Sequence, residues 1–128
     1  MIGAIIGDIV GSRFEFGAAP QQGFELFTPD CSYTDDTICT IAIADAVLNE
    51  RDYQESLLDW CRRYPDPMGG YGRRFYQWIN ADNPQPTDSF GNGSAMRVSP
   101  IGWLFDEWED VIEEAKKSAI VSHNHPEG

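Results

Sequence analysis

Two adjacent carboxylates flanked by two hydroxyls are the residues of this chain best suited to chemistry. They form the stretch Thr34-Asp35-Asp36-Thr37. Neighbouring carboxylates repel each other, and burying them is unfavourable unless a cation or a hydrogen-bond donor compensates. Oxygen ligands of this kind suit Mg²⁺, Ca²⁺ or Mn²⁺ rather than zinc or copper. Ordinary helix capping is the alternative, because Thr is a favoured N-cap and Asp in a first turn complements the helix dipole.

Two further acids stand in unexpected surroundings. Asp8 interrupts an apolar run, where it either has a function or caps a neighbouring backbone. Glu15 lies between two phenylalanines at the start of a predicted loop. Such a carboxylate could have a raised pKa and act as an acid or a base, or it could be a solvated loop charge.

A turn of small residues and a histidine complete the set of candidates. Gly91-Asn92-Gly93-Ser94 precedes a predicted helix, so its backbone N–H groups could hold a phosphate or a ribose oxygen. A simple Asn/Gly turn is the alternative. His123 could be a metal ligand, but the oxygen-rich acids elsewhere favour a cap or a ligand contact.

The elements that must position these residues are all predicted to be helices. No convincing alternation of period two appears, so the fold class is predicted to be all-α. Residues 17–33 have no period and predict a long loop. Residues 122–128 have the signature of a helix start, with polar caps followed by Pro126. The apolar spacing predicts helices over 1–12, 34–49, 53–64, 71–79, 92–105 (kinked or restarted at Pro100) and 106–121.

The first predicted helix carries glycines four residues apart, at Gly3, Gly7 and Gly11. Glycine in a helix is unfavourable by up to about 1 kcal/mol relative to Ala. Three on one face therefore indicate the close approach of a backbone or of a ligand. The alternative is a glycine-rich loop after a short strand.

Composition excludes several classes of function. The chain has 128 residues, a net charge of −12 and 41% hydrophobic residues, which is enough for the core of one domain. Its acidity disfavours nucleic acids and anionic membranes, which attract basic surfaces. Three cysteines without Cys-x-x-Cys spacing predict reduced thiols and a cytoplasmic protein. The apolar N-terminus is too short to span a membrane and lacks a basic leader.

The order of these segments resembles the ADP-ribosylglycohydrolase family. The resemblance extends over essentially the whole chain, and the combination is far more specific than any single motif. The segments that carry it are Gly3-Ala4-Ile5-Ile6-Gly7-Asp8-Ile9-Val10-Gly11-Ser12, Glu15, Thr34-Asp35-Asp36-Thr37, Gly91-Asn92-Gly93-Ser94-Ala95-Met96-Arg97 and His123-Asn124-His125-Pro126.

The resemblance implies an all-α, orthogonal multi-helix bundle and a hydrolase that cleaves N- or O-glycosidic ADP-ribosyl linkages. It also implies a binuclear Mg²⁺ centre, with Mn²⁺ possible. Carried over by motif, Thr34, Asp35 and Asp36 are expected to ligate metal, and Glu15 and Asp36 to take part in catalysis. The ligand contacts are expected from Gly91, Asn92, Gly93, Ser94 and His123.

The chain departs from the family pattern in one respect, because it has no second Asp-x-Asp-Thr-type motif. Residues 1–128 are therefore expected to be the N-terminal portion of a single, truncated domain. The expected substrate is an ADP-ribosylated protein or an ADP-ribose-containing small molecule. The alternatives are a relative that binds ADP-ribose or serves a structural role without catalysis, and one half of a split enzyme. Exposed apolar helices would then favour self-association or a complementing C-terminal half.

Overall fold

The computed structural model describes residues 1–127, and within them the secondary structure is helical, with no strand. The all-α prediction is confirmed. The elements are α1 (Ile2–Gly11), the short 3₁₀ turn η1 (Ser12–Phe14), α2 (Asp35–Leu48), α3 (Tyr53–Arg63), α4 (Arg73–Ile79), α5 (Ile101–Leu104) and α6 (Trp108–Ile120). No described helix has both the length and the apolar character needed to cross a membrane.

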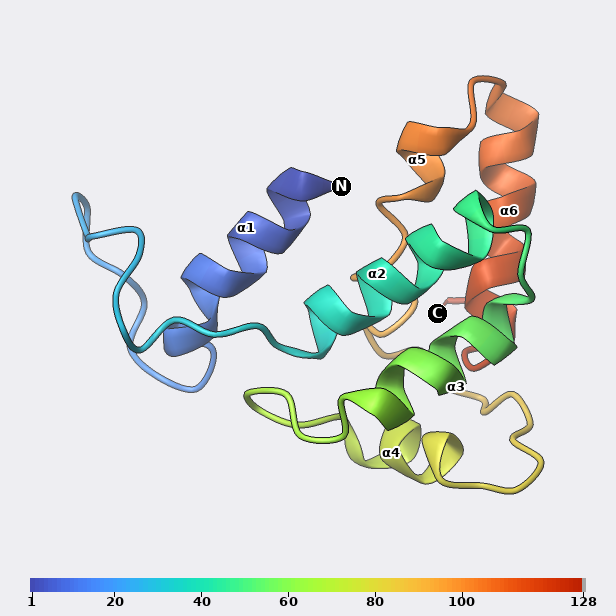
Figure 1. The fold of residues 1–128 in the computed structure, drawn as a ribbon, viewed down its shortest axis with the longest axis horizontal. Helices are drawn as coiled ribbons and strands as arrows, with labels where there is room; N and C mark the ends of the chain where they lie inside the picture. The colour runs from blue at the N-terminus through green and yellow to red at the C-terminus, as the bar shows by residue number, and fades with distance from the viewer. Residues whose placement is uncertain (128) are drawn as a thin grey trace.

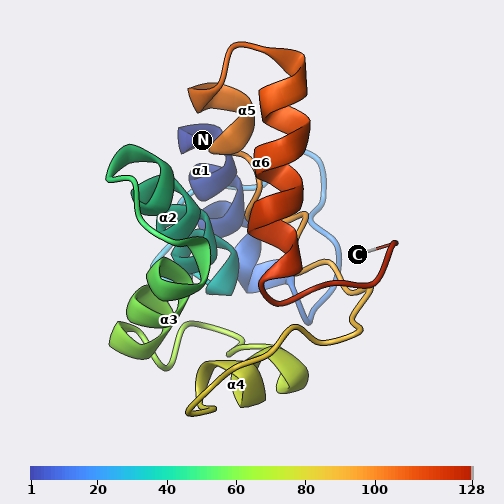
Figure 2. The same ribbon diagram turned by 90° about the vertical axis from the view of Figure 1, so that its right-hand side faces the viewer.

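Helix α2 is the centre of the molecule. It runs between α1 at one end and α5 and α6 at the other, with α3 packed along one side and α4 lying beyond α3 (Figure 1). The turned view in Figure 2 shows α6 lying alongside α5. Eight of the 14 residues of α2 are buried, as its nearly all-apolar sequence predicts. The core around it consists of Ile38, Cys39, Ala42, Ile43, Leu57, Cys61, Trp78, Ile79 and Ile101.

Small and polar residues fix α3 against α2. The Ser56 hydroxyl is buried and donates to the Ala42 carbonyl oxygen at 2.8 Å, so the two helices cross closely. The Asp45 carboxylate accepts from Arg51 at 2.6 Å and from the Trp60 indole at 3.0 Å. These contacts join the C-terminal half of α2 to α3 and leave the N-terminus of α2 free to form a site.

The predicted helix over 92–105 is wrong for most of its length. Residues 92–97 form successive turns, and only Ile101–Leu104 are helical. Gly91 and Gly93 lie at the start of this segment, and glycine has a high entropic cost in a helix. Ser99 precedes Pro100, and a following proline disfavours the α conformation. In the expected helix start at 122–128, Pro126 and Glu127 form a turn, and Gly128 lies outside the described residues.

Asp8 joins α1 to the N-terminus of α2. Its carboxylate accepts from the backbone N–H and the hydroxyl of Thr34, at 3.0 and 2.6 Å. It also accepts from the backbone N–H and the hydroxyl of Thr37, at 3.2 and 2.5 Å. The helix N-terminus thus has a carboxylate from another helix as its cap, in addition to the Thr34 hydroxyl, which accepts from the Asp36 N–H. Asp8 is therefore an acid that caps a neighbouring backbone.

This cap predicts a large stability effect. We expect Asp8→Ala to lower the free energy of unfolding by about 2–4 kcal/mol, because four donors lose a charged acceptor. The matched control is Asp52→Ala, which removes an ordinary N-cap bond from Asp52 to the Glu55 N–H and should cost about 1 kcal/mol. Urea unfolding in the presence of a chelator measures both. A loss for Asp8→Ala no larger than the control's would contradict this role.

Candidate functional site

Four carboxylates surround the N-terminus of α2. Burial, followed by the charges of Asp36 and Glu15, raises the pKa of Asp35 to about 6, and Asp8 adds to the effect. Burial also raises the pKa of Asp36, again with contributions from Asp8 and Glu15. A group of acids that disfavours its own ionisation in this way is a place where a cation would be stabilising.

A cavity of about 370 Å³, here called the acidic cavity, opens beside this group. Apart from the adjoining residues and the backbone of α1 itself, no atom in the described structure lies within 4 Å of a Cβ placed on Gly3, Gly7 or Gly11. The glycine face is therefore not explained by a packed backbone, and two of its members face the cavity. The residues that line it are Gly7, Asp8, Gly11, Ser12, Glu15, Thr34, Asp36 and Asn92.

A turn from elsewhere in the chain lies close to Glu15. A Cβ placed on Gly69 would lie 3.0 Å from Glu15 Oε2, and Gly69 has φ +80°, which favours glycine. The Met68 N–H donates to the Tyr33 carbonyl oxygen at 3.2 Å, so the same turn is tied to the residue before Thr34. No pattern in the sequence indicates that residues 67–70 lie beside Glu15.

A second cavity of about 450 Å³, here called the loop cavity, lies on the other side of the helix start. Asp35 faces it, whereas Asp36 faces the acidic cavity, as expected for neighbours about 100° apart around a helix. Asn92 lines both cavities, so the two adjoin at this residue. The loop cavity is lined by Asp35, Gly72, Arg73, Arg74, Phe75, Trp78, Thr87, Ser89, Gly91, Asn92, Gly93, Met96, Arg97, Ser122 and His123.

His123 supports the turn at 91–94. A Cβ on Gly93 would come within 2.7 Å of the His123 ring, so only glycine fits against the imidazole. Burial and the nearby Arg97 charge lower the pKa of His123 to about 4, which keeps the ring neutral at pH 7. Its Nδ1 is 2.9 Å from the Ser122 hydroxyl oxygen. The neutral histidine therefore constrains the turn by its shape rather than by charge, and its Nδ1 is occupied by Ser122.

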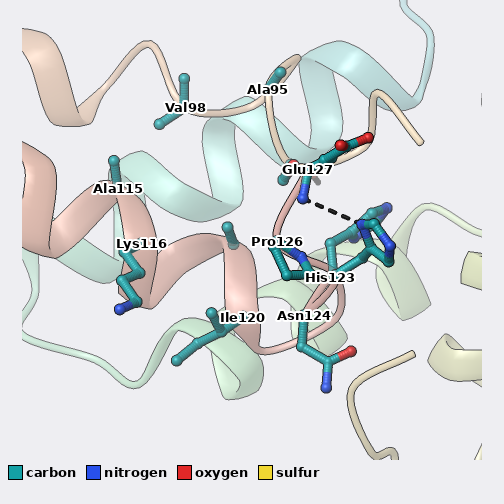
Figure 3. Close-up of a pocket in the computed structure, with 12 residues that line it drawn as sticks. Ala95, Val98, Ala115, Lys116, Ile120, His123, Asn124, Pro126 and Glu127 are labelled. Carbon is teal, nitrogen blue, oxygen red and sulfur yellow. Dashed lines mark hydrogen bonds between the residues drawn. The ribbon is translucent and has the colours of Figure 1, made fainter. Parts of the chain in front are cut away.

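Ser94 is placed differently from its three neighbours in the turn. It is buried and lines a third cavity, of about 750 Å³, at the C-terminal end of α6. Figure 3 shows this cavity, with His123 and Asn124 at one side and Lys116 and Ile120 on the helix. His123 lines both this cavity and the loop cavity, but Ser94 does not line the loop cavity.

The oxygen atoms of Thr34, Asp35 and Asp36 are the type of ligand that a hard divalent cation prefers. They supply only part of the coordination sphere that such a cation needs. Thr34 Oγ1 donates to Asp8 and accepts from the Asp36 N–H, which leaves one lone pair for a metal. Within residues 1–127 there is no cluster of three His, Cys, Asp or Glu side chains placed to hold an ion. Mg²⁺ takes six oxygen ligands, several of which are usually waters. Asp35 and Asp36, facing separate cavities, could each hold a different ion.

Three arginines at the loop cavity were not among the predicted site residues. Arg97 ends the motif that begins at Gly91, and Arg73 and Arg74 follow the glycines of residues 69–72. Nothing in the helical spacing of these residues indicates that they face one cavity. The one sequence feature that could have drawn attention to them is the adjacent pair Arg73 and Arg74 in a chain of net charge −12.

Comparison with known proteins shows the family to which this chain belongs. The sequence pattern of the ADP-ribosylglycohydrolase family matches residues 1–128, and the chain belongs to that family. It is similar to the ADP-ribosylhydrolase ARH3 of Xenopus tropicalis, with 28% identity over 153 residues, covering 96% of this chain and 43% of the relative. The human ARH3 is 27% identical over 158 residues, with 96% and 43% covered. The chain thus spans less than half the length of these relatives.

A solved structure shows the same fold. A chain described as an ADP-ribosylglycohydrolase-related protein complex superposes with a TM-score of 0.66 at 23% identity. The match covers 98% of this chain and 48% of that chain. The helical arrangement around α2 is therefore a fold seen in this class of protein.

The raised pKa of Asp35 predicts a pH-dependent stability. Because the folded state binds this proton more tightly than the unfolded state, metal-free protein should lose stability as the pH rises from about 4 through about 6. Asp35→Asn removes the charge and should raise the free energy of unfolding at pH 7.5 by about 1–2 kcal/mol. This gain should vanish near pH 4. Asp106→Asn, at an exposed position, is the control for net charge, and an equal gain in that variant would contradict the assignment.

The fit between Gly93 and His123 predicts a second effect. Gly93→Ala should destabilise the protein by about 1–3 kcal/mol, because the added methyl overlaps the imidazole ring. Gly102→Ala, where no atom lies within 4 Å of the new Cβ, is the matched control and should be neutral or slightly stabilising. Thermal unfolding compares the two. If both substitutions have the same effect, the ring does not require glycine at position 93.

Proposed function

We propose that this chain forms the metal- and ligand-binding part of a hydrolase that cleaves ADP-ribosyl linkages with Mg²⁺ or Mn²⁺ as cofactor. One observation carries the proposal: the acidic cavity and the loop cavity adjoin at Asn92, beside the N-terminus of α2. A ligand there could present hydroxyls to the carboxylates and its remaining groups to the turn at 91–93. Family membership and the ARH3 relatives support the same class of reaction.

Thr34, Asp35 and Asp36 would be ligands of a binuclear centre, with Asp35 and Asp36 contributing from separate cavities. When bound, Mg²⁺ supplies a Lewis acid that orients water and lowers its pKa. Glu15 lines the acidic cavity with Asp36, where its carboxylate could accept a proton from an attacking water. Cleavage at an anomeric carbon develops positive charge, which nearby carboxylates stabilise. The role of His123 is to fix the turn at 91–93 as a neutral ring.

A second candidate has support from α1. This helix consists almost wholly of apolar residues and glycine, yet only Val10 is buried, and Ile2 and Ile6 are 69% and 46% exposed. Such a surface suits a covering partner. Together with the partial donor set, it favours a chain that binds ADP-ribose without turnover until a complementing C-terminal half, or a second copy, supplies further ligands.

Metal addition tests the proposed site. MgCl₂ should raise the melting temperature of the protein at pH 7.5, because only the folded state holds the carboxylates together. Asp35→Asn and Asp36→Asn should each abolish the rise, and Asp106→Asn should retain it. A rise that persists in both site variants would refute these ligands.

Release of ADP-ribose from peptides modified on arginine or serine tests the reaction. If the protein turns over, Glu15→Gln and Asp36→Asn should lower the rate by on the order of 100-fold. Bound ADP-ribose without release, even with Mg²⁺ present, would select the second candidate. Turnover that both substitutions leave unchanged would contradict the catalytic assignment.

A further inference from the structure

Two buried thiols lie in contact where α2 and α3 cross. Cys39 of α2 and Cys61 of α3 are both fully buried, and their Sγ atoms are 3.9 Å apart. The bond from the Ser56 hydroxyl to the Ala42 carbonyl oxygen holds the two helices close together at this crossing. All three cysteines of the described chain are free thiols. Because an S–S bond is about 2 Å long, the two sulfurs need to approach by only about 2 Å to become bonded.

One of the two thiols has a cavity beside it. Cys61 lines a cavity of about 430 Å³, here called the thiol cavity, which is formed by the end of α3, by α4 and by neighbouring loop residues. Tyr71 lines it too, and its hydroxyl is 3.4 Å from the Cys61 carbonyl oxygen. Cys39 does not line this cavity, and no lining residue is shared with the acidic cavity or the loop cavity. A small solute that enters through a local opening of this wall therefore meets Cys61 first.

A buried cation without a carboxylate partner acts on both thiols. Arg97 Nη2 donates to the Ser118 carbonyl oxygen and the Ser122 hydroxyl, whereas its Nε and Nη1 are buried without a partner. Among residues 1–127, no ion pair includes Arg97. Burial lowers the pKa of this arginine, and the Cys39 and Cys61 thiols oppose that change. A thiolate at this place would therefore give the guanidinium a counter-charge.

The two thiols differ in how readily they ionise. The Cys39 thiol, the Tyr71 hydroxyl and the Arg97 charge lower the pKa of Cys61, against the effect of burial. The same S–H···S contact, together with burial, raises the pKa of Cys39 well above its usual value. Buried cysteines are usually inert apolar residues. The sulfur contact, the cavity and the cation distinguish this pair, with Cys61 as the nucleophile and Cys39 as its resolving thiol.

We propose that Cys39 and Cys61 form a modification site at which a small hydroperoxide converts the two thiols into a disulfide between α2 and α3. The Cys61 sulfur attacks one peroxide oxygen, the O–O bond breaks, and the other oxygen leaves as water, which makes a sulfenic acid. The Cys39 sulfur then attacks the Cys61 sulfur, the S–S bond forms, and the sulfenic oxygen leaves with the Cys39 proton as a second water. Two thiols are thus oxidised and one peroxide is reduced. The site is independent of the proposed function, although Cys39 follows Asp35 by four residues, or about one helical turn.

Hydrogen peroxide treatment of the folded chain, followed by peptide mapping, tests the site. Cleavage after lysine and arginine places Cys31 and Cys39 in peptide 14–51 and Cys61 in peptide 52–62. The variants C31S and C39A each keep two thiols that would link the same two peptides, so each is the matched control of the other. C31S keeps the proposed pair and should yield at least tenfold more linked peptide than C39A, in chains of monomer mass. The intact C31S chain should lose two hydrogen atoms, and dithiothreitol should restore them.

The controls separate a site made by the fold from the general reactivity of thiols. Circular dichroism checks that both variants fold. In urea the advantage of C31S over C39A should fall to about onefold, because loops of similar length then close with similar probability. An advantage that persists in urea, or equal yields in the folded variants, would overturn the proposal. Oxidation of Cys61 to a sulfinic acid without linked peptide would also overturn it, as would unreacted Cys39 and Cys61 in wild-type chains whose half-buried Cys31 is oxidised.

Discussion

The carboxylate of Asp8 is the contact on which the rest of the site depends. It takes four hydrogen bonds from Thr34 and Thr37 and so fixes α1 across the first turn of α2. That turn carries Asp35 and Asp36, and their directions into two cavities follow from its position. Because a helix start has unpaired N–H groups, an acid from another helix both satisfies them and adds to the local negative charge. Asp8 therefore contributes both to the stability of the fold and to the negative charge of the site.

The two cavities beside the N-terminus of α2 differ in the charges that line them. Asp8, Glu15 and Asp36 line the acidic cavity beside α1, whereas Asp35 lines the loop cavity together with three arginines, and Asn92 lines both cavities. Burial penalises the charges of Asp35, Asp36 and Arg97, whereas Arg73 and Arg74 are exposed.

The sequence pattern predicted the structure correctly where a single residue type determines it. Thr34 at the N-cap of α2 was predicted from residue type, and the structure places it there. The pattern failed at residues 92–105, where apolar spacing resembled a helix but glycine and Pro100 opposed one. The turns that form instead bury Arg97 and direct Ser94 into a different cavity from Gly93. The spacing of apolar residues in the sequence does not indicate which of two cavities a residue in a turn will face.

By itself, the sequence determined the all-α class, the central apolar helix and a family resemblance that the whole chain bears out. These depend on residue type and short-range periodicity, which a single chain displays directly. Only the tertiary structure decided that Asp8 caps α2, that Gly69 contacts Glu15, and that Arg73 and Arg97 share a cavity. The partners in these contacts lie 24 to 54 residues apart. Their meeting depends on how the helices pack, and no local preference encodes it.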